Sequence, residues 1–325
     1  MAKAKPFIKW VGGKTQLIEQ LDRQLPADFG NWQDATYIEP FVGGGAMLFY
    51  MLQQYPNISH AVINDINPDL TMCYRTVRDN PDMLIESLRD IQNTYLALKT
   101  EETRKEFFLA VRDRYNEKNL DPIENTTKFF FLNRTCFNGL YRENKKGLFN
   151  VPFGKYANPQ ICDEMTIKAD SRLLQHVEIL TGDFEATFEY AANNTLFYFD
   201  PPYRPLSDTS SFNDYTKESF NDDAQVRLKK YCDRIHQAGH KFMLSNSDCK
   251  GKNEADNFFD ILYGEYEIEK VWASRNINSD ASKRGKLTEI LVHNYNNTKA
   301  VAYIDNFQLE PCYVAEEIEP LRNAL

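Results

Sequence analysis

The chain has 325 residues, 42% of them hydrophobic, and a formal net charge of −9 at pH 7. This length can bury a large core and holds one large domain or two ordinary ones. The first ten residues are basic and polar, and no apolar run is as long as a membrane span, which argues against a signal peptide and a membrane protein. We therefore expect a cytoplasmic protein with no membrane partner. The net acidity argues against a nucleic-acid partner at face value, but binding depends on local charge.

The first predicted elements form a strand, a glycine loop and a helix. Residues 37–39 resemble a buried strand, residues 43–45 form the loop, and an apolar helix continues to residue 52. Glycines in such a loop let a ligand touch the backbone, and the following helix N-terminus attracts negative charge. An earlier helical pattern begins at Thr15.

The next predicted strand, residues 61–64, ends at Asp65, twenty residues after Gly45. A Rossmann-like fold places an acid at about this distance to hold ribose hydroxyls. A helix-capping role for Asp65 or Asn67 is the alternative, and the two roles are compatible.

The strand and helix alternation breaks after Asp69. Apolar spacing predicts a helix over residues 83–115 and another over residues 124–134. Residues 128–155 then carry six basic side chains against one acidic side chain, interleaved with aromatic, Asn and Gly residues. This composition is typical of loops that follow a nucleic-acid backbone, although many charged segments are only solvated surface.

The sheet pattern resumes with a strand over residues 177–181 that leads to Asp183. A helix is predicted over residues 224–237 and a strand over residues 241–245. Residues 265–273 and 287–294 predict a hairpin around a second basic segment, 275–286.

The stretch LFYFDPPY, residues 196–203, is the centre of this pattern. Its apolar first half is typical of a strand buried on both faces, and two prolines cannot continue a central strand because they donate no ladder hydrogen bonds. Asp200 therefore lies at the carboxyl end of a strand, where open α/β sheets bind their ligands. An ordinary strand-to-turn transition is the alternative on these residues alone.

The chemistry of DPPY favours a functional interpretation. An exocyclic amine on an aromatic base is a poor nucleophile because its lone pair is delocalised into the ring. A site that alkylates this amine must accept hydrogen bonds from both of its protons. Asp200 and the carbonyl of Pro201 supply two acceptors, Pro202 adds no competing N–H, and Tyr203 offers a face for stacking. The stretch resembles the signature of methyltransferases that act on amino groups conjugated to a π system.

Six segments follow one another in a characteristic order: FIKWVGGK, EPFVGGG, NDIN, FFFLNRTCFNGLYR running into FNVPFGKY, GDF and DPPY. Together they resemble the Dam-like, alpha-class N6-adenine-specific DNA methyltransferases, over about residues 6–294. The resemblance implies an α/β fold, a Rossmann-like S-adenosylmethionine-dependent methyltransferase sheet with an inserted, mostly helical target-recognition domain. We expect residues 1–70 and 166–300 to form the catalytic, cofactor-binding domain, residues 71–165 the DNA target-recognition domain, and residues 301–325 an acidic C-terminal extension.

The resemblance also implies where the cofactor S-adenosylmethionine binds. Trp10 and Lys14 would lie at its methionine end, Asp65 would hold the ribose hydroxyls, and Asp183 would accept from the adenine amine, with Phe184 beside the ring. The expected cofactor-binding residues are Trp10, Lys14, Phe41, Gly43, Gly45, Asp65, Asp183, Phe184 and Asp200, and the expected catalytic residues are Asp200, Pro201, Pro202 and Tyr203.

For the double-stranded DNA partner, the resemblance implies the site GATC. The arginine matching Arg142 contacts a guanine in relatives that read GATC, a common specific contact. Residues matching Leu140 and Pro152 touch neighbouring bases, and Phe137, where tyrosine is more usual, would wedge into the base stack. The expected DNA-binding residues are Arg134, Phe137, Asn138, Leu140, Arg142, Asn144, Asn150, Pro152 and Lys155, of which Arg134, Asn144, Asn150 and Lys155 are phosphate or loop-positioning candidates.

The predicted function is site-specific transfer of a methyl group to the N6 amine of an adenine flipped out of DNA. Alternatives are the same chemistry on another adenine-containing site, cytosine N4, an RNA adenine or a glutamine amide, and a non-catalytic DNA-binding relative. An NAD-type oxidoreductase is disfavoured because G-x-G-x-x-G is missing. No metal is expected, because the cysteines form no C-x-x-C pair and His236 and His240 lack a third ligand. The oligomeric state and a role in a restriction–modification system stay open.

Overall fold

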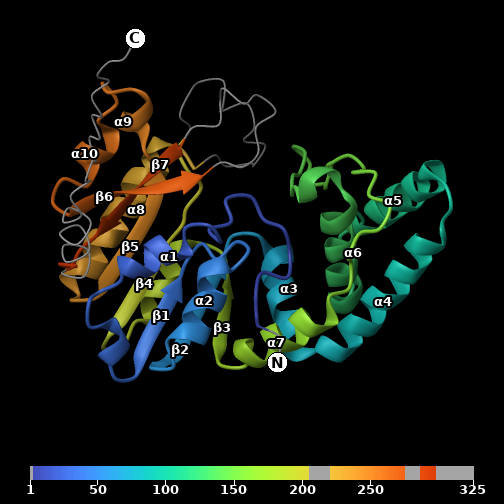
Figure 1. Ribbon diagram of the computed structural model, residues 1–325, viewed down its shortest axis with the longest axis horizontal. Helices are drawn as coiled ribbons and strands as arrows, with labels where there is room; N and C mark the ends of the chain where they lie inside the picture. The colour runs from blue at the N-terminus through green and yellow to red at the C-terminus, as the bar shows by residue number, and fades with distance from the viewer. Residues whose placement is uncertain (1–2, 205–219, 275–285, 298–325) are drawn as a thin grey trace, which may run out of the picture.

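A seven-stranded β-sheet forms the larger part of the computed structural model, which describes residues 3–204, 220–274 and 286–297 (Figure 1). Most of the second basic segment, residues 275–286, and the expected acidic extension, residues 301–325, lie outside these ranges. The strand order is β3-β2-β1-β4-β5-β7-β6. The strands are β1 (Ala35–Glu39), β2 (Ile58–Asp65), β3 (Val177–Thr181), β4 (Thr195–Phe199), β5 (Lys241–Ser247), β6 (Glu267–Ser274) and β7 (Lys286–His293).

Strands β1 to β5 are mutually parallel, and β7 enters antiparallel between β5 and β6. The carboxyl ends of β1 to β4 therefore meet at one edge of the sheet. The predicted hairpin is confirmed, since β6 and β7 pair antiparallel from Glu267 opposite His293 to Ser274 opposite Lys286.

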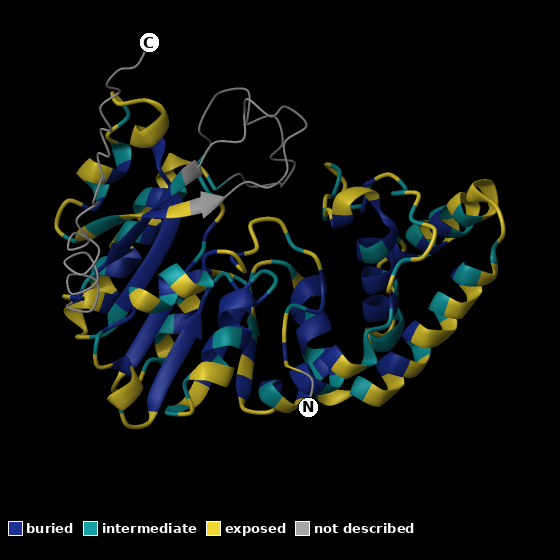
Figure 2. Ribbon diagram, viewed as in Figure 1, coloured by how far each residue is buried: buried dark blue, intermediate teal, exposed yellow. Residues whose placement is uncertain are grey.

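Both faces of the sheet are covered, and successive residues of a strand enter different cores. In β4, Leu196 and Tyr198 join one buried cluster, whereas Phe197 and Phe199 join the other. Every residue of β4 is buried, which explains its continuous apolar sequence. Figure 2 shows this burial in the central strands, while exposed residues lie on the outer sides of the helices.

Helices from different parts of the chain supply the two cores. Leu21 and Met47 belong to the first cluster, and Leu228, Ile235 and Phe259 to the second. The helical pattern expected from Thr15 begins as an α-helix only at Ile18. The helices concerned are α1 (Ile18–Arg23), α2 (Ala46–Gln54), α3 (Pro68–Asp79), α7 (Glu164–Leu174), α8 (Asp222–Gln237), α9 (Cys249–Lys252) and α10 (Phe258–Leu262).

A helical part lies beside the sheet and contains α4 (Pro81–Ala97), α5 (Glu101–Tyr115) and α6 (Pro122–Thr135) (Figure 1). The prediction of one helix over residues 83–115 is wrong. The chain leaves helical geometry at Leu98, and Thr100 begins α5 with a capping box to Thr103. Thr-x-x-Thr is not the usual Ser/Thr-x-x-Glu/Gln form, which explains why the pattern did not predict this break.

The α/β class predicted from the sequence is confirmed. A mostly parallel sheet has helices on both faces, and a helical segment enters between β2 and β3. No helix in the described ranges is both long enough and apolar enough to cross a membrane. Within the same ranges, no group of three or more His, Cys, Asp or Glu side chains is arranged to hold a metal ion.

Candidate active site and nucleic-acid interface

Three strand ends are tied together at the edge where the acids gather. Asn64, at the end of β2, is buried, and its side-chain amide donates at 3.0 Å to the carbonyl of Pro40 and at 3.0 Å to that of Gly182. Pro40 follows β1, and Gly182 follows β3. These hydrogen bonds fix the spacing between the glycine loop and the two acidic positions, Asp65 and Asp183.

The glycine loop needs its glycines for two separate reasons. Gly43 and Gly45 have φ angles of +49° and +72°, in the left-handed region that favours glycine. A Cβ at Gly45 would lie 2.4 Å from the hydroxyl of Tyr74, and a Cβ at Gly43 would lie 2.9 Å from Trp10. The loop is therefore packed between two aromatic side chains.

Asp65 binds the backbone of this loop and the backbone just before α3. Its Oδ2 accepts from the amide of Gly43 at 3.1 Å, and its Oδ1 accepts from that of Asn67 at 2.9 Å. Burial raises the pKa of Asp65 to about 6, although these hydrogen bonds oppose the rise. Each carboxylate oxygen keeps acceptor capacity for a further donor. The helix-capping role that the sequence offered for Asp65 or Asn67 is performed by Asn67, whose side chain accepts from two amides at the start of α3.

Asp183 and Phe184 lie at the neighbouring strand end. Asp183 forms an ion pair with Arg227 of α8, and its side chain also accepts from the amide of Glu185. Phe184 is buried, and its ring centroid lies 5.2 Å from that of Phe41. Phe184 therefore forms an aromatic pair with Phe41 beside Asp183.

Asp200 lies beside a buried lysine. The side chain of Asp200 is 20% exposed, and its Oδ1 lies 3.3 Å from Nζ of Lys14, whose side chain is 6% exposed. The same Nζ lies 3.0 Å from Oε2 of Glu289 and donates to the hydroxyl of Tyr203. Tyr203 donates in turn to Glu289 at 2.8 Å. One cation thus joins two carboxylates and the tyrosine of DPPY.

The pKa of Asp200 reflects this arrangement. Burial raises the pKa of Asp200 to about 6, the positive charge of Lys14 opposes the rise, and the negative charge of Glu289 adds to it. Near neutral pH the side chain is therefore mainly a carboxylate, which can only accept hydrogen bonds.

Sequence reasoning missed Glu289. It lies in β7, opposite Ser247 of β5, among buried Ile290, Leu291 and Val292. A single acid inside such an apolar run is the signal that could have identified it, because buried carboxylates require partners.

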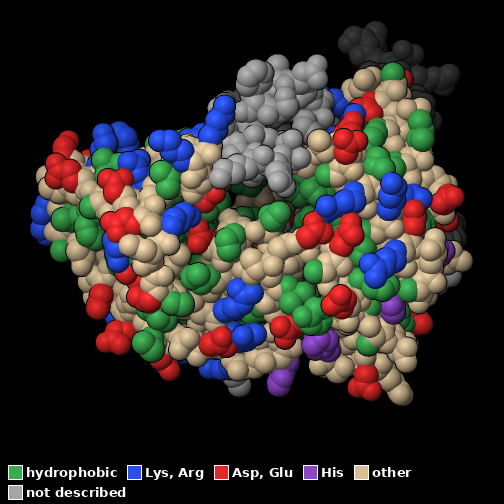
Figure 3. Space-filling model, turned by 180° about the vertical axis from the view of Figure 1, so that it is seen from behind, with side chains coloured by type: hydrophobic (Ala, Val, Ile, Leu, Met, Phe, Trp, Pro, Cys, Tyr) green, Lys and Arg blue, Asp and Glu red, His purple; other side chains and the backbone are tan. Residues whose placement is uncertain are grey.

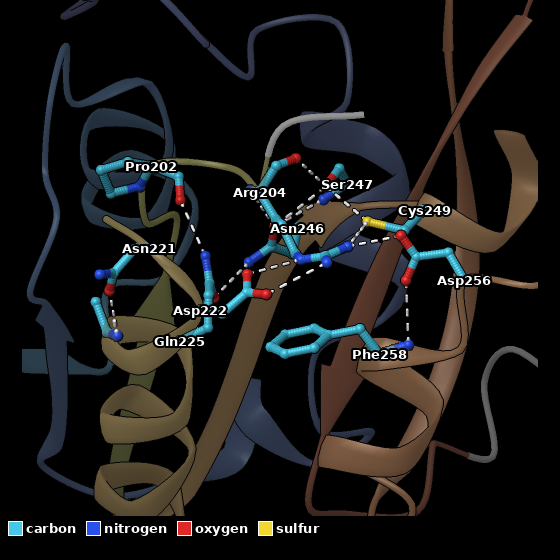
Figure 4. A network of polar contacts seen from close by, with 11 residues as sticks. Pro202, Arg204, Asn221, Asp222, Gln225, Asn246, Ser247, Cys249, Asp256 and Phe258 are labelled. Carbon is cyan, nitrogen blue, oxygen red and sulfur yellow. Dashed lines mark hydrogen bonds and ion pairs between the residues drawn. The ribbon is translucent and has the colours of Figure 1, made fainter. Parts of the chain in front are cut away.

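Arg204, directly after DPPY, was also missed. Figure 4 shows its guanidinium between two acids, Asp222 at 2.8 Å and Asp256 at 2.7 Å. The guanidinium also lies 4.5 Å from the centroid of the Phe258 ring.

The backbone around Arg204 is held by buried polar side chains of β5 and α8 (Figure 4). The carbonyl of Arg204 accepts from Ser247 at 2.8 Å, and that of Pro202 accepts from the side chain of Gln225 at 3.2 Å. Asn246 links the two sides, because it donates to Gln225 and accepts from the amide of Arg204. This network fixes the exit of the DPPY loop.

The N-terminal segment joins the site to the helical part. Asn133 of α6 pairs with both backbone groups of Lys9 at 2.8 Å and donates to the carbonyl of Gly139 at 3.0 Å. Trp10 stacks on Tyr141, with centroids 5.5 Å apart. Tyr141 therefore connects the glycine loop, through Trp10, to the predicted DNA-reading segment.

The predicted base-reading side chains lie together at an exposed surface. Phe137 is 51% exposed and Leu140 is 36% exposed, and the amide of Phe137 donates to the carbonyl of Pro152 at 2.9 Å. Arg142 is exposed, and its Nε donates to Oδ1 of Asn150 at 2.8 Å. Figure 3 shows Lys and Arg side chains gathered along the upper edge of the helical part.

The remaining DNA candidates have different surroundings. Arg134 points inward and donates to the carbonyl of Phe7 at 2.7 Å, and burial lowers its pKa, so it suits a positioning role and not a phosphate contact. Asn144 accepts from the amides of Lys146 and Leu148 within its own turn. Asn138 is exposed with a φ of +55°, and Lys155 is exposed and pairs with Glu101.

A Rossmann-like sheet with acids after β2, β3 and β4 and a DPPY loop is the arrangement expected of a methyltransferase that acts on amino groups. The family model of D12 class N6 adenine-specific DNA methyltransferases matches residues 10–277. The chain belongs to this family and is an adenine-specific DNA methyltransferase.

Named relatives agree with this assignment. The Type II methyltransferase M.MjaIII of Methanocaldococcus jannaschii is 48% identical over 296 residues, which cover 90% of this chain and 100% of the relative. The Type II methyltransferase M1.LlaDCHI of Lactococcus lactis subsp. cremoris is 39% identical, with 90% and 96% covered. The DNA adenine methylase of Vibrio cholerae is 31% identical, with 90% and 96% covered.

Proposed function

We propose that this enzyme transfers a methyl group from S-adenosylmethionine to the N6 amine of an adenine extruded from double-stranded DNA, within the site GATC. The observation that carries the proposal is the carboxylate of Asp200 at the end of β4, held by Lys14 at the same edge as Asp65 and Asp183. Extrusion belongs to the proposal because an amine inside the base stack is out of reach of such a site.

The residues at this edge fit the cofactor. In the proposal Asp65 holds the ribose hydroxyls, Asp183 accepts from the adenine amine, and Phe41 and Phe184 lie beside the ring. The loop from Gly43 to Gly45 supports the methionine end, where a side chain in place of either glycine would collide with an aromatic ring or hydroxyl. Trp10 and Lys14 close this end. The ammonium of Lys14 also contacts the catalytic residues Asp200 and Tyr203, and it pairs with Glu289.

Asp200 and the carbonyl of Pro201 accept hydrogen bonds from the two protons of the target amine, and Tyr203 stacks on the base. Pro202 shapes the turn without adding a donor. When bound, the cofactor would supply an electrophilic methyl group on a sulfonium. The N–C bond would form as the S–C bond breaks, a neutral thioether would leave, and the proton released by the methylated amine would pass to water. Most of the acceleration in this scheme comes from positioning.

Arg142 reads a guanine of the site, and Leu140 and Pro152 contact neighbouring bases. Phe137, exposed beside them, fills the space that the extruded adenine leaves. Asn150 holds the guanidinium of Arg142. Asn138, Asn144 and Arg134 shape the loop. Lys155 contacts phosphate, which requires it to exchange its partner Glu101 for the DNA.

The test uses labelled S-adenosylmethionine with two duplexes of equal length, one that contains GATC and one that lacks it. We expect label in adenine N6 of the GATC duplex only. Asp200→Ala should retain cofactor affinity within a few fold and lose methyl transfer, because one of the two acceptors for the amine is gone. Asp113→Ala, which removes an exposed acid of α5, is the matched control and should retain full activity.

Each part of the proposal has its own contradicting result. Retained turnover in Asp200→Ala would overturn the catalytic assignment. Equal labelling of both duplexes would overturn GATC and leave the chemistry in place. Binding of DNA without any methyl transfer by the parent protein would favour a non-catalytic relative.

A further inference from the structure

The segment that carries Arg142 is a short hairpin, residues 142–150, which we call the recognition hairpin. Glu143 and Phe149 form an antiparallel bridge, and the amide of Asn150 donates to the carbonyl of Arg142 at 3.1 Å. At the tip, the amide of Asn144 donates to the carbonyl of Leu148 at 2.9 Å. The hairpin is only nine residues long, and an isolated two-stranded hairpin is marginal in water.

The turn between α5 and α6 holds this hairpin from outside. The side chain of Asn116 accepts from the amide of Phe149 at 2.8 Å and donates to its carbonyl at 3.0 Å. Lys118, two residues later, lies 3.3 Å from Glu143, the residue opposite Phe149. The turn therefore contacts both residues of the bridge, Glu143 and Phe149, next to Arg142.

Lys118 anchors the hairpin to the rest of the molecule. Its ammonium also lies 2.8 Å from Oδ2 of Asp69, in the first turn of α3. Asp69 is buried and accepts from Tyr115 at 2.6 Å and from Asn125 at 3.1 Å. Burial raises the pKa of Asp69, but the hydrogen bonds from Lys118 and Tyr115 outweigh it, so the pKa lies below its ordinary value.

The backbone of Lys118 gives independent support. Its φ is +55°, in the left-handed region that is unfavourable for a residue other than glycine. Glycine is the common residue just after a helix end, where this conformation occurs. A lysine at this position is explained by what its ammonium does, because glycine would leave Asp69 and Glu143 without their cation.

The other neighbour of Arg142 is fixed as well. Tyr141 donates to Glu143 at 2.6 Å, and its ring stacks on Trp10 at 5.5 Å and on Phe129 at 5.3 Å. Residues on both sides of Arg142 are thus anchored, while its own side chain is exposed and held by Asn150. The contacts fix the backbone at the reading position and leave the guanidinium at the surface.

We propose that Lys118 is a positioning residue for sequence discrimination, which, together with the backbone contacts of Asn116, holds the recognition hairpin so that Arg142 meets its base. The inference rests on the proposed reading role of Arg142 and goes beyond it, because neither residue belongs to the reading surface. A direct phosphate contact by Lys118 predicts something different, namely equal weakening on all sequences and a smaller salt slope.

The experiment measures discrimination without assuming the recognition site. Unmethylated phage DNA is incubated with each variant and S-adenosylmethionine, and methylated adenines are read by single-molecule sequencing. Discrimination is methylation at the parent's preferred motif divided by methylation at sites that differ by one base. We expect Lys118→Met and Glu143→Gln each to lower this ratio about fivefold or more. About fivefold is the lower end of the discrimination that a bidentate arginine–guanine contact supplies. Their double variant should lose less than the product of the two effects.

Lys146→Met is the matched control, because it removes the same charge from the exposed tip of the same hairpin and should leave the ratio unchanged. Lys118→Met could lose discrimination through misfolding alone. Glu143→Gln breaks the same ion pair but keeps the shape of the side chain at a partly exposed position, so it tests the contact separately. An unchanged ratio in folded Glu143→Gln and Lys118→Met overturns the inference. Uniform loss on all sites in Lys118→Met assigns a phosphate contact and also overturns it. A parent that methylates no adenine contradicts the proposed function itself.

Discussion

The ammonium of Lys14 lies 3.3 Å from the carboxylate of Asp200 and 3.0 Å from that of Glu289, so one cation separates two acids beneath the DPPY loop. These residues come from a loop near the N-terminus, the end of β4 and the middle of β7. Because like charges raise the pKa of a carboxyl and an opposite charge lowers it, the cluster sets the pH range in which Asp200 is an acceptor.

The first prediction concerns the pH dependence of methyl transfer. Asp200 must be ionised to accept from the target amine, and its pKa is about 6, so kcat/KM should fall as the pH is lowered through about 6. Lys14→Met removes the opposing charge and should move this inflection to higher pH. Glu289→Gln removes the repelling charge and should move it to lower pH. Shifts of the same sign in the two variants would contradict the arrangement.

The second prediction compares two glycines with left-handed backbones. Gly239→Ala, at a φ of +85° with no atom within 4 Å of the added Cβ, should lower the free energy of unfolding by only about 1–2 kcal/mol. Gly45→Ala adds a collision with the hydroxyl of Tyr74 and should cost more and also weaken cofactor binding. Urea denaturation and titration with S-adenosylmethionine measure the two effects. Similar cofactor affinity in both variants would argue against a role for the loop in the cofactor site.

The third prediction concerns Arg204. Arg204→Met leaves Asp222 and Asp256 without their shared cation and should lower the free energy of unfolding by about 1–3 kcal/mol. It should also lower kcat about tenfold or more, because small displacements of catalytic groups are costly. Arg204→Lys should rescue only part of the loss, since one ammonium cannot replace the planar fork.

Lys250→Met is the control for Arg204, because it breaks an ion pair with Asp260 in which both side chains are about half exposed. Such surface pairs contribute about 0–1 kcal/mol. A stability loss without any change in kcat for Arg204→Met would leave Arg204 a purely structural role.

The fourth prediction tests the wedge. With 2-aminopurine in place of the target adenine, extrusion should increase fluorescence, and Phe137→Ala should reduce this increase, by roughly tenfold if the ring compensates for the cost of unstacking. Met83→Ala removes a similarly exposed apolar side chain from α4, away from the predicted reading surface, and should change nothing. Full fluorescence in Phe137→Ala would assign the filling of the gap to another residue.

Much of the fold was predictable because its signals are local. Continuous apolar runs indicate strands buried on both faces, and the glycines before α2 and the acid at the end of β2 follow from a recurrent βαβ geometry. The hairpin of β6 and β7 and the helix α8 were predicted for the same reason. The break between α4 and α5 was not, because it depends on a single cap at Thr100 in a sequence that otherwise keeps its helical spacing.

The sequence by itself determined that acids stand at or just after the ends of β2, β3 and β4 and that DPPY follows the fourth strand, since strand ends and prolines act within a few residues. Only the tertiary structure decided which groups those acids meet. Glu289 reaches Lys14, 275 positions away, because β7 enters the sheet antiparallel beside β5. Lys118 reaches Glu143 and Asp69 because a turn, a hairpin and the start of α3 pack together. Such contacts depend on strand register and packing between distant segments, which no local pattern of residues encodes.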